Sequence, residues 1–460
     1  MSKNSIFRLL LIVTALQLFV TSCKKDDPTV VLADTTASYD ANVALGWHKV
    51  FLDVERFSPN FRPPIAARAL GYIGLAAYEA AVPGMTNYQS LAPSYTGLTL
   101  PKIEIGKKYH WPTVLNACYA TSMKAHFPNM PAKQLTLVNN LEKGINDGLI
   151  ARMPLDVFNR SKDFGKKVAD AVYTFSKTDL VGHNAYLNPV DKNYPDGTKL
   201  GDWTRTFPDF TSPLLPNWGN CRPMCITKAD MKMPAPIPYS ENPTSEFYKQ
   251  AKEVQVTIQN VKAGKDKEGR WIADFWSDDC AGLTMTPAGR WISVANQVVE
   301  RKKPNLETAV LTYSKISLAL CDAGIAAWDQ KFFWKLERPQ SYIRRVLGDK
   351  DWNSIMCPAE GVGKTPPFPA YPSGHSTFGA AACEILTDIY GNNYAMTDFS
   401  HFGRTEFIGT PRTFKNFYAM ADENAFSRIP IGVHYRMDCT EGLALGYRVA
   451  KKVNAMKWKK

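Results

Sequence analysis

The sequence predicts a mainly α-helical protein. In residues 65–79, small and apolar side chains recur every three or four positions, as in a helix that packs closely against other helices. The alternation of apolar and polar residues that marks a half-buried strand is almost absent. With 460 residues, of which 45% are hydrophobic and 12% aromatic, the chain can bury one large core or two medium ones. We therefore expect a globular bundle of helices.

The first 22 residues read as a signal peptide. Lys3 and Arg8 precede an apolar run over residues 9–20, which is shorter than the roughly 20 residues of a membrane-spanning helix. Small residues directly before Cys23 resemble a bacterial lipobox, in which the cysteine is lipidated, although a chance cysteine after an ordinary signal peptide would look the same. We expect residues 23–40 to be a tether and no other run to span a membrane. The protein would then be an exported lipoprotein, anchored to the bacterial outer membrane.

Helical patterns fill two parts of the mature chain, separated by an irregular segment. The first part covers residues 41–181, and its segments 135–149 and 163–175 are amphipathic. Residues 182–234 are rich in Pro, Gly, Asn and Trp, and we expect them to be irregular. Helices are expected again over residues 245–261, 289–299, 305–333, 376–390 and 434–455. We place a boundary near residue 235, between an N-terminal helical region (41–234) and a bundle that carries the active site (235–460).

Charge and cysteine content narrow the function classes. The formal net charge is +12, but the tail at residues 457–460 is the one dense basic run, so we expect a mildly basic solvated surface and no nucleic-acid partner. Eight cysteines follow Cys23, and export would permit disulfides. Cys221 and Cys225 are the closest pair in sequence and our first candidate for a bridge. Cys321 and Cys383 lie in apolar helical stretches and should be buried thiols. Without a CxxC pattern, we expect no structural zinc.

Two segments combine cations with a helix start. Lys331 and Arg338 are separated by six residues. They lie on the last turns of an expected helix and in the loop beyond it. Ser373, Gly374 and His375 follow a proline and open another apolar helix. Taken alone, the cations could be surface charges and the serine an ordinary helix cap. Taken together, they can surround an oxyanion, because helix-end amides and cationic side chains both donate to anions.

A third segment adds two more groups of the same kind. Arg428 precedes His434, and Asp438 follows that histidine at position i+4, on one face of the expected helix. An i,i+4 pair can be merely structural. In an oxyanion site, however, one imidazole can bond to the central atom while the other, His375, moves protons. Asp438 would then orient and polarise the bonding imidazole.

The three motifs, Lys-x6-Arg-Pro, Pro-Ser-Gly-His and Ser-Arg-x5-His-x3-Asp, resemble the signature of the vanadium haloperoxidase and type 2 phosphatidic-acid phosphatase superfamily. The resemblance covers residues 235–460 and implies a helical bundle of the vanadium chloroperoxidase-like fold. It implies that the oxygens of the bound oxyanion are held by Lys331, Arg338, Ser373, Gly374 and Arg428. It also implies that His375 is the acid/base. His434 would be the vanadate ligand in a haloperoxidase, or the nucleophile in a phosphatase, which needs no cofactor.

Neighbouring residues favour the haloperoxidase branch. Trp328 and Phe368 match positions that flank the halide and peroxide side of the pocket in vanadium chloroperoxidases, although both could simply be core residues. The segments 275–279 and 286–291 resemble bacterial relatives, in which an aspartate pairs with an active-site arginine. We choose Asp278 for that role over Asp279.

We therefore expect a vanadate-dependent enzyme that oxidises halide with hydrogen peroxide, with Lys331 polarising the peroxide. The first alternative is a phosphomonoesterase that forms a phosphohistidine, because both branches share the motifs. The second alternative is a surface lipoprotein that binds an oxyanion without catalysis. The substrates would be peroxide and halide in the first case and a phosphate ester in the second.

Overall fold

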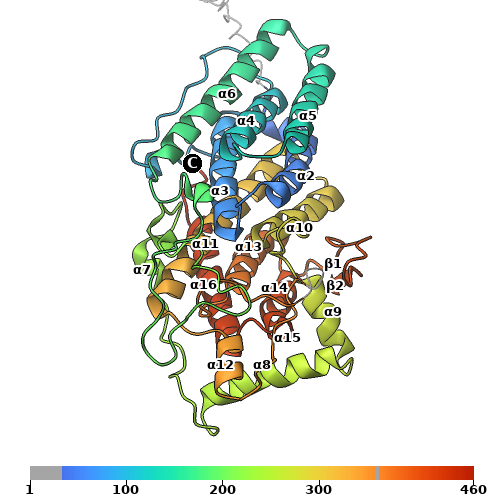
Figure 1. Ribbon diagram of the computed structural model, residues 1–460. Helices are drawn as coiled ribbons and strands as arrows, with labels where there is room; N and C mark the ends of the chain where they lie inside the picture. The colour runs from blue at the N-terminus through green and yellow to red at the C-terminus, as the bar shows by residue number, and fades with distance from the viewer. Residues whose placement is uncertain (1–33, 358–361) are drawn as a thin grey trace, which may run out of the picture. The chain divides into compact units, whose positions relative to one another are not determined.

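The computed structural model describes residues 34–357 and 362–460, and it is mainly helical, as predicted (Figure 1). The one sheet among the described residues has two short antiparallel strands, β1 (Met396–Asp398) and β2 (Arg412–Phe414). The predicted signal peptide, Cys23 and most of the predicted tether lie outside the described residues.

The α-helices account for nearly all regular structure in the described part of the chain. In chain order they are α2 (Asn42–Phe57), α3 (Pro63–Ala81), α4 (Trp111–His126), α5 (Ala132–Ile150), α6 (Leu155–Lys177), α7 (Lys228–Met231), α8 (Glu246–Lys262), α9 (Lys267–Phe275), α10 (Pro287–Lys302), α11 (Leu306–Trp334), α12 (Pro339–Arg345), α13 (Gly374–Tyr390), α14 (Phe417–Phe426), α15 (Arg428–Ile431) and α16 (Arg436–Asn454). The last expected helix therefore begins two residues later than predicted, so that His434 precedes it.

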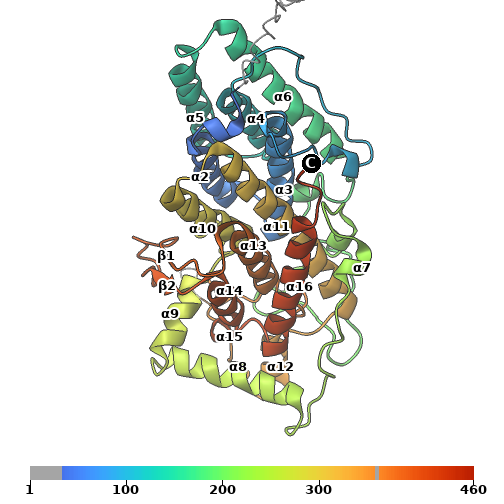
Figure 2. The same cartoon turned by 180° about the vertical axis from the view of Figure 1, so that it is seen from behind.

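The centre of the unit is built on close packing between α3 and α11. A Cβ atom added at Gly74 of α3 would lie 2.6 Å from the Cβ atom of Ser317 in α11, so only glycine permits this approach. In both views of the ribbon, α2, α4, α5 and α6 surround one end of this pair, while α8 and α12 lie at the other end (Figures 1 and 2). Because α13 and α16 also contact α11, the residues that carry the three motifs lie on neighbouring helices.

Two helices correct the expectation that no run beyond the signal peptide could span a membrane. Residues 63–84 and α11 are long and apolar enough by length and composition. Both are almost wholly buried by other helices, however, as core helices of a compact protein are. The apolar length that the sequence shows is thus used for packing within the described unit.

Residues 34–460 form one compact unit. Helix α3 precedes the boundary expected near residue 235 and α11 follows it, yet the two helices pack against each other. The two expected regions therefore share one core, and the division at residue 235 stays a prediction. The segment before it contains short turns and α7 rather than longer helices. Part of the segment packs against the chain that leads to Phe368, since the Leu214 amide donates to the Pro367 carbonyl (2.9 Å).

The disulfide prediction is wrong. The bridge joins Cys280 and Cys357, whose Cα atoms are 5.4 Å apart although 77 positions separate them in sequence. Cys221 and Cys225 are both free thiols. Proximity in sequence misled because the fold, not the chain, sets the distance between cysteines. Cys321 and Cys383 are buried free thiols, as predicted.

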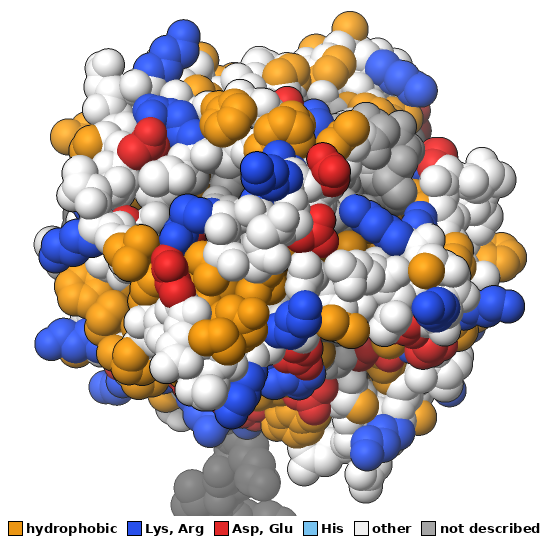
Figure 3. Space-filling model, turned by 60° about the horizontal axis from the view of Figure 1, so that its bottom comes forward, with side chains coloured by type: hydrophobic (Ala, Val, Ile, Leu, Met, Phe, Trp, Pro, Cys, Tyr) orange, Lys and Arg blue, Asp and Glu red, His pale blue; other side chains and the backbone are white. Residues whose placement is uncertain are grey.

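One face of the molecule, shown in Figure 3, is mixed in charge rather than strongly basic. On the face in Figure 3, Lys and Arg side chains are scattered among acidic, polar and apolar ones. This distribution gives no sign of the continuous basic stripe that a nucleic-acid interface would present on that face.

Candidate active site

Lys331 and Arg338 lie at the junction between α11 and α12. Lys335 adopts a left-handed conformation (φ 50°) that ends α11, and Arg338 is the residue directly before Pro339, the first residue of α12. The two cations therefore come from the last turn of one helix and the start of the next. Both side chains are completely buried.

Ser373 has the helix-capping role that the simpler interpretation gave it. Its hydroxyl accepts a hydrogen bond from the Ser376 amide (3.3 Å), and its own amide donates to the carbonyl of Asp438 (2.9 Å). This second bond ties the start of α13 to α16. A Cβ atom added at Gly442 of α16 would lie 2.7 Å from the Ser373 carbonyl oxygen, so the absence of a side chain there allows the two helices to meet.

His434 and Asp438 contact each other, but not on one helix face as predicted. His434 lies in the turn before α16, and the Asp438 carboxylate, in the first turn of that helix, accepts from the Tyr435 amide (3.0 Å). The same oxygen lies 2.9 Å from Nδ1 of His434. If this nitrogen donates to the carboxylate, Nε2 carries a lone pair. The capping geometry thus orients the imidazole.

The predicted residues meet around one small cavity. Its lining includes Trp328, Phe368, Gly374, His375, Arg428 and His434. Lys331, Arg338, Ser373 and Asp438 are buried beside these side chains through the contacts described here, so the structure brings all ten together. We call this group of ten residues the cationic cup.

Lys331 is anchored by backbone carbonyls. Its ammonium group donates to the carbonyl oxygens of Pro369 (2.9 Å), Ala370 (3.0 Å) and Pro372. These three acceptors use all three N–H bonds of the ammonium. In this conformation Lys331 contributes a positive charge to the cup and holds the chain that leads into α13.

The two arginines of the cup keep part of their guanidinium groups free of protein partners. Arg338 donates to the carbonyls of Phe368 and Val433 (both 2.7 Å), and its Nη1 lies 3.1 Å from Nε2 of His434. Arg428 donates to the Trp276 carbonyl and to the Ser427 hydroxyl (2.9 Å). In the cup, the buried nitrogens without a hydrogen-bond partner are Nη2 of Arg338, Nη1 of Arg428 and Nε2 of His375.

Burial and mutual repulsion shift the ionisation of these groups. Burial lowers the pKa of Arg338 to about 9 and that of Arg428 to about 10. Burial, followed by the nearby arginine charges, lowers the pKa values of His375 and His434. Burial raises the pKa of the Asp438 carboxyl. The shifts of the two arginines and the two histidines oppose accumulated positive charge, so a bound anion would counteract them.

Trp328 and Phe368 form one wall of the cup. Their ring centroids are 4.7 Å apart, and Phe368 also lies 4.9 Å from the guanidinium carbon of Arg338 and 5.1 Å from the Lys331 ammonium. Both rings are buried, which fits the core interpretation as well as the pocket one. The structure supports both, because the same rings line the cavity and contact the cations.

Asp278 pairs with an arginine that the sequence analysis did not assign. The carboxylate accepts from Nε of Arg290 (3.1 Å), and Asp398 accepts from Nη1 (3.1 Å). Nε2 of His401 lies 2.5 Å from the same guanidinium. Arg428 makes no ion pair with Asp278, although the negative charge of Asp278 raises its pKa. We call Arg290, Asp278, Asp398 and His401 the Arg290 cluster.

The residues of the Arg290 cluster differ in how far they could be predicted from the sequence. The segment 286–291, which contains Arg290, resembles bacterial relatives, but nothing in that segment predicts the partners of Arg290. His401 and Asp398 lie more than 100 positions further along the chain, in a stretch without a recognisable motif. Only the fold reveals that they converge.

An oxyanion fits the cup. Three buried nitrogens lack partners, the cations outnumber Asp438, and burying unpaired charge is costly unless an anion accompanies it. Among residues 34–357 and 362–460, no group of three or more His, Cys, Asp or Glu side chains could hold a bare metal ion. Vanadate, which needs one imidazole and several N–H donors, matches this set of residues, and so does phosphate.

Comparisons with known proteins agree with this geometry. Residues 312–459 match the family model of the second helical-bundle domain of vanadium chloroperoxidase. The vanadium chloroperoxidase of Curvularia inaequalis is 25% identical over 513 aligned positions, which cover 88% of this chain and 80% of that protein. The chain belongs to the vanadium haloperoxidase superfamily.

Solved structures extend the likeness of this superfamily member over nearly the whole chain. The structure described as the first bacterial vanadium-dependent iodoperoxidase is 27% identical, with a TM-score of 0.78, and the match covers 91% of this chain and 97% of that one. A bacterial vanadium-dependent chloroperoxidase in its holo form matches in fold at 15% identity, with a TM-score of 0.65, over 87% of this chain and 93% of that one. These relatives indicate that the protein is an enzyme with haloperoxidase-like function at the level of the superfamily.

Proposed function

We propose that the protein is a vanadate-dependent haloperoxidase, which converts hydrogen peroxide, a halide ion and a proton to hypohalous acid and water. The observation that carries the proposal is the set of unpartnered buried nitrogens on Arg338, Arg428 and His375 beside an imidazole oriented by Asp438. The aromatic wall and the likeness to vanadium haloperoxidases favour peroxide chemistry over phosphate-ester hydrolysis.

Three residues of the cup would hold the vanadate in this proposal. Nε2 of His434 would bind vanadate, and the free N–H groups of Arg338 and Arg428 would donate to its oxygens. When bound, vanadate supplies a Lewis-acidic centre that activates peroxide toward a halide.

The remaining residues control protons and water. His375 lines the cavity, and its Nε2, which has no hydrogen-bond partner, can hold or release a proton. Trp328 and Phe368 exclude water from one side, which favours a weakly hydrated halide. Lys331 holds the backbone of residues 369–372 and adds charge, a positioning task beside the predicted polarisation of peroxide.

The decisive experiment compares two activities of one preparation. Purified protein is loaded with orthovanadate, and the oxidation of iodide, bromide and chloride by peroxide is measured. Hydrolysis of an aryl phosphate is measured before and after loading. Halide oxidation that requires vanadate, without phosphate release, supports the proposal. Phosphate release that vanadate inhibits supports the phosphatase instead.

A variant series separates catalysis from simple binding. His434→Ala should abolish halide oxidation and weaken vanadate binding by more than the roughly 10- to 100-fold typical of a residue that only supports a metal ligand. Wild-type protein that binds vanadate tightly but oxidises no halide when loaded, and hydrolyses no aryl phosphate when unloaded, would support the non-catalytic binder.

We also propose that the protein is exported and lipid-anchored through Cys23. The support is the sequence alone, namely the apolar run and the small residues before Cys23. Fractionation of the source bacterium should place the protein with the outer membrane, and Cys23→Ser should release it. Recovery of both forms in the soluble fraction would contradict the proposal.

A further inference from the structure

A basic surface lies at the end of the unit where the described chain begins. The Asp34 carbonyl accepts from the indole of Trp111 (2.7 Å), the first residue of α4, so the chain enters the unit beside residues 101–110, which lead into α4. These residues run along α6, because the Arg160 guanidinium donates to the Lys108 carbonyl (2.9 Å). Figures 1 and 2 show α6 at the end of the unit that lies opposite α8 and α12. We call residues 101–109 and 155–167 the basic end.

The charge of the basic end is unbalanced. It carries seven Lys or Arg residues and three Asp or Glu residues, a net charge of +4. Two of the acids, Asp156 and Asp163, already form ion pairs within α6. The lysines that form no ion pair within the described part of the chain are Lys102, Lys107, Lys108, Lys162 and Lys166. The protein therefore leaves positive charge on this surface without neutralising it.

An apolar side chain projects among these lysines. Ile105 is 99% exposed, the largest exposed fraction of any large hydrophobic side chain in residues 34–357 and 362–460. It is held in a turn, in which the Lys107 amide donates to the Glu104 carbonyl (3.2 Å) and Gly106 adopts a left-handed conformation (φ 76°). The turn thus presents an isoleucine to solvent directly before two lysines.

Helix α6 presents the same combination of side chains. Leu155, Lys162 and Lys166 are seven and four residues apart, so they lie on one face of the helix. Leu155 is 60% exposed. An open groove of about 650 Å³ is lined by Lys162 and Lys166 on one side and by residues 101–104 and Tyr109 on the other. The turn and the helix face therefore border one groove.

This combination fits the surface of a bilayer. Lysines are attracted to anionic headgroups, and an exposed apolar side chain can enter the boundary between headgroups and acyl chains. The proposed lipid on Cys23 would hold a membrane nearby, because Asp34 follows Cys23 by 11 positions and 11 residues span at most about 40 Å. Since the described chain begins beside the basic end, this surface is the one that the anchor would bring to the membrane.

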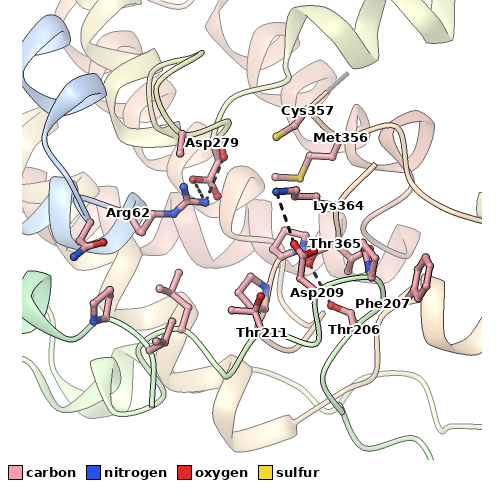
Figure 4. A pocket seen from close by; sticks show the side chains of 18 residues that line it. Arg62, Thr206, Phe207, Asp209, Thr211, Asp279, Met356, Cys357, Lys364 and Thr365 are labelled. Carbon is pink, nitrogen blue, oxygen red and sulfur yellow. Dashed lines mark hydrogen bonds and ion pairs between the residues drawn. The ribbon is translucent and has the colours of Figure 1, made fainter. Parts of the chain in front are cut away.

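The opening beside the cationic cup is built from other segments. A cavity that shares Asp279 and Met356 with the cup is lined by the chain before α3, the irregular segment, the loop after α9 and the chain before α13 (Figure 4). No residue of its lining belongs to the basic end. A membrane-facing surface and an opening for substrates can therefore coexist on this protein.

We infer that the basic end docks on a phospholipid bilayer with anionic headgroups. Its lysines lie against headgroup phosphates, and Ile105 inserts between the headgroups. The inference does not depend on halide oxidation, and it rests on the proposed anchor at Cys23 only for the distance to the membrane. An anchored protein is then held in one orientation, with the basic end toward the bilayer.

Docking is tested first without the lipid anchor. Because residues 34–460 form one compact unit, the chain from residue 24 is purified without signal peptide and lipid, and it is sedimented with vesicles. Binding is expected to vesicles that contain phosphatidylglycerol, not to phosphatidylcholine alone, and it should weaken at high salt. Lys107→Gln/Lys108→Gln should lower the affinity about 30-fold, a factor of about 5 for each lysine. Ile105→Ser should lower it roughly 2- to 10-fold, the equivalent of partial burial of an isoleucine.

Two control variants make matched changes at the opposite end of the unit. Lys265→Gln/Lys267→Gln alters two exposed lysines at the junction of α8 and α9, and Leu200→Ser alters a leucine that is 68% exposed. Both should bind as wild type does. Absent binding, or equal binding by all variants, overturns the inference. Binding to soluble polyphosphate as tight as that to vesicles, with no effect of Ile105→Ser, also overturns it, because the surface would then be a general anion site.

The anchored protein gives an independent measurement. Lipid-modified wild type in vesicles with phosphatidylglycerol is treated with an amine-reactive reagent, and labelling of each lysine is measured by mass spectrometry. Lys107 and Lys108 should be protected relative to detergent-solubilised protein, whereas Lys265 and Lys267 should not, and equal labelling overturns the inference. A membrane-bound wild type whose unlipidated chain ignores anionic vesicles overturns the docking surface alone. Vesicle binding by a protein that carries no lipid in the cell supports the docking surface and overturns the anchor.

Discussion

Two regions of this protein bury arginine completely, and they treat the charge in opposite ways. In the Arg290 cluster, the guanidinium lies against the carboxylates of Asp278 and Asp398 and against His401. In the cationic cup, Arg338 and Arg428 lie against carbonyls, a hydroxyl and an imidazole, and each keeps one unpartnered nitrogen. The difference teaches that burial of a cation does not by itself indicate a ligand site. A buried cation without an anionic partner in the protein does indicate one.

Asp278 connects the two regions. Burial opposes its ionisation, but the charge of Arg290 lowers its pKa, so it stays negative. Burial lowers the pKa values of Arg428 and His375, and the charge of Asp278 offsets part of this lowering. The Arg290 cluster is therefore a fixed structural support whose surplus negative charge reaches the cup. Four predictions test this contrast by the change in unfolding free energy of the vanadate-free protein.

The largest loss of stability is expected from Arg290→Met. The substitution leaves Asp278 and Asp398 buried without their cation, which typically costs about 3–5 kcal/mol. Urea unfolding measures the loss. Arg152→Met, at an exposed position, is the control and should change stability by less than about 0.5 kcal/mol. Similar values for the two variants would show that the cluster is not the structural support described here.

Lys331→Met should cost less, about 2 kcal/mol. The substitution removes the donor to the carbonyls of Pro369, Ala370 and Pro372, but it also removes a buried charge, and the two effects partly offset each other. Lys350→Met, exposed on a turn, is the matched control in the same unfolding assay. A Lys331 variant as stable as the control would mean that the ammonium does not hold this chain segment.

Glu55→Gln tests the reverse case, a buried acid that lacks a cation. Burial raises the pKa of Glu55 from 4.5 to about 8, although its carboxylate accepts from the Thr286 amide. Stability from the protonated form is complete below pH 4.5 and is lost as the pH rises through about 8. The variant should therefore match wild type near pH 4.5 and become steadily more stable than wild type as the pH rises through about 8. A difference that does not change with pH would refute the shifted carboxyl.

Arg338→Met should change stability least and binding most. Losing the bonds to the Phe368 and Val433 carbonyls is offset by removing an unpaired buried charge, so the net change should be close to zero. Vanadate affinity should fall about 10- to 150-fold, the equivalent of one charged hydrogen bond. The readout is the gain in melting temperature with orthovanadate. At 100 times Kd, wild type should gain about 2.7 kcal/mol. A large stability loss without a change in affinity would reverse the contrast.

The sequence predicted the residues of the cup because they lie within three short motifs or a few positions from them. Helix periodicity located the helices that carry Lys331 and Ser373, and the spacing of His434 and Asp438 predicted a contact that the structure contains. The contact was predicted on a shared helix face. In the structure His434 precedes α16, and the capping geometry at the start of that helix brings His434 and Asp438 together. Asp278 was recognised without its true partner, Arg290.

The sequence by itself determined the helical class, the superfamily and the residue types of the cup, because these depend on periodicity and spacing within short segments. Only the tertiary structure decided which cysteines pair and which arginines receive a carboxylate. The disulfide joins positions that are 77 apart in sequence, and Arg290 and Asp398 are 108 apart. Whether such positions meet in space is set by how α3, α11, α13 and α16 pack, and no local pattern encodes it.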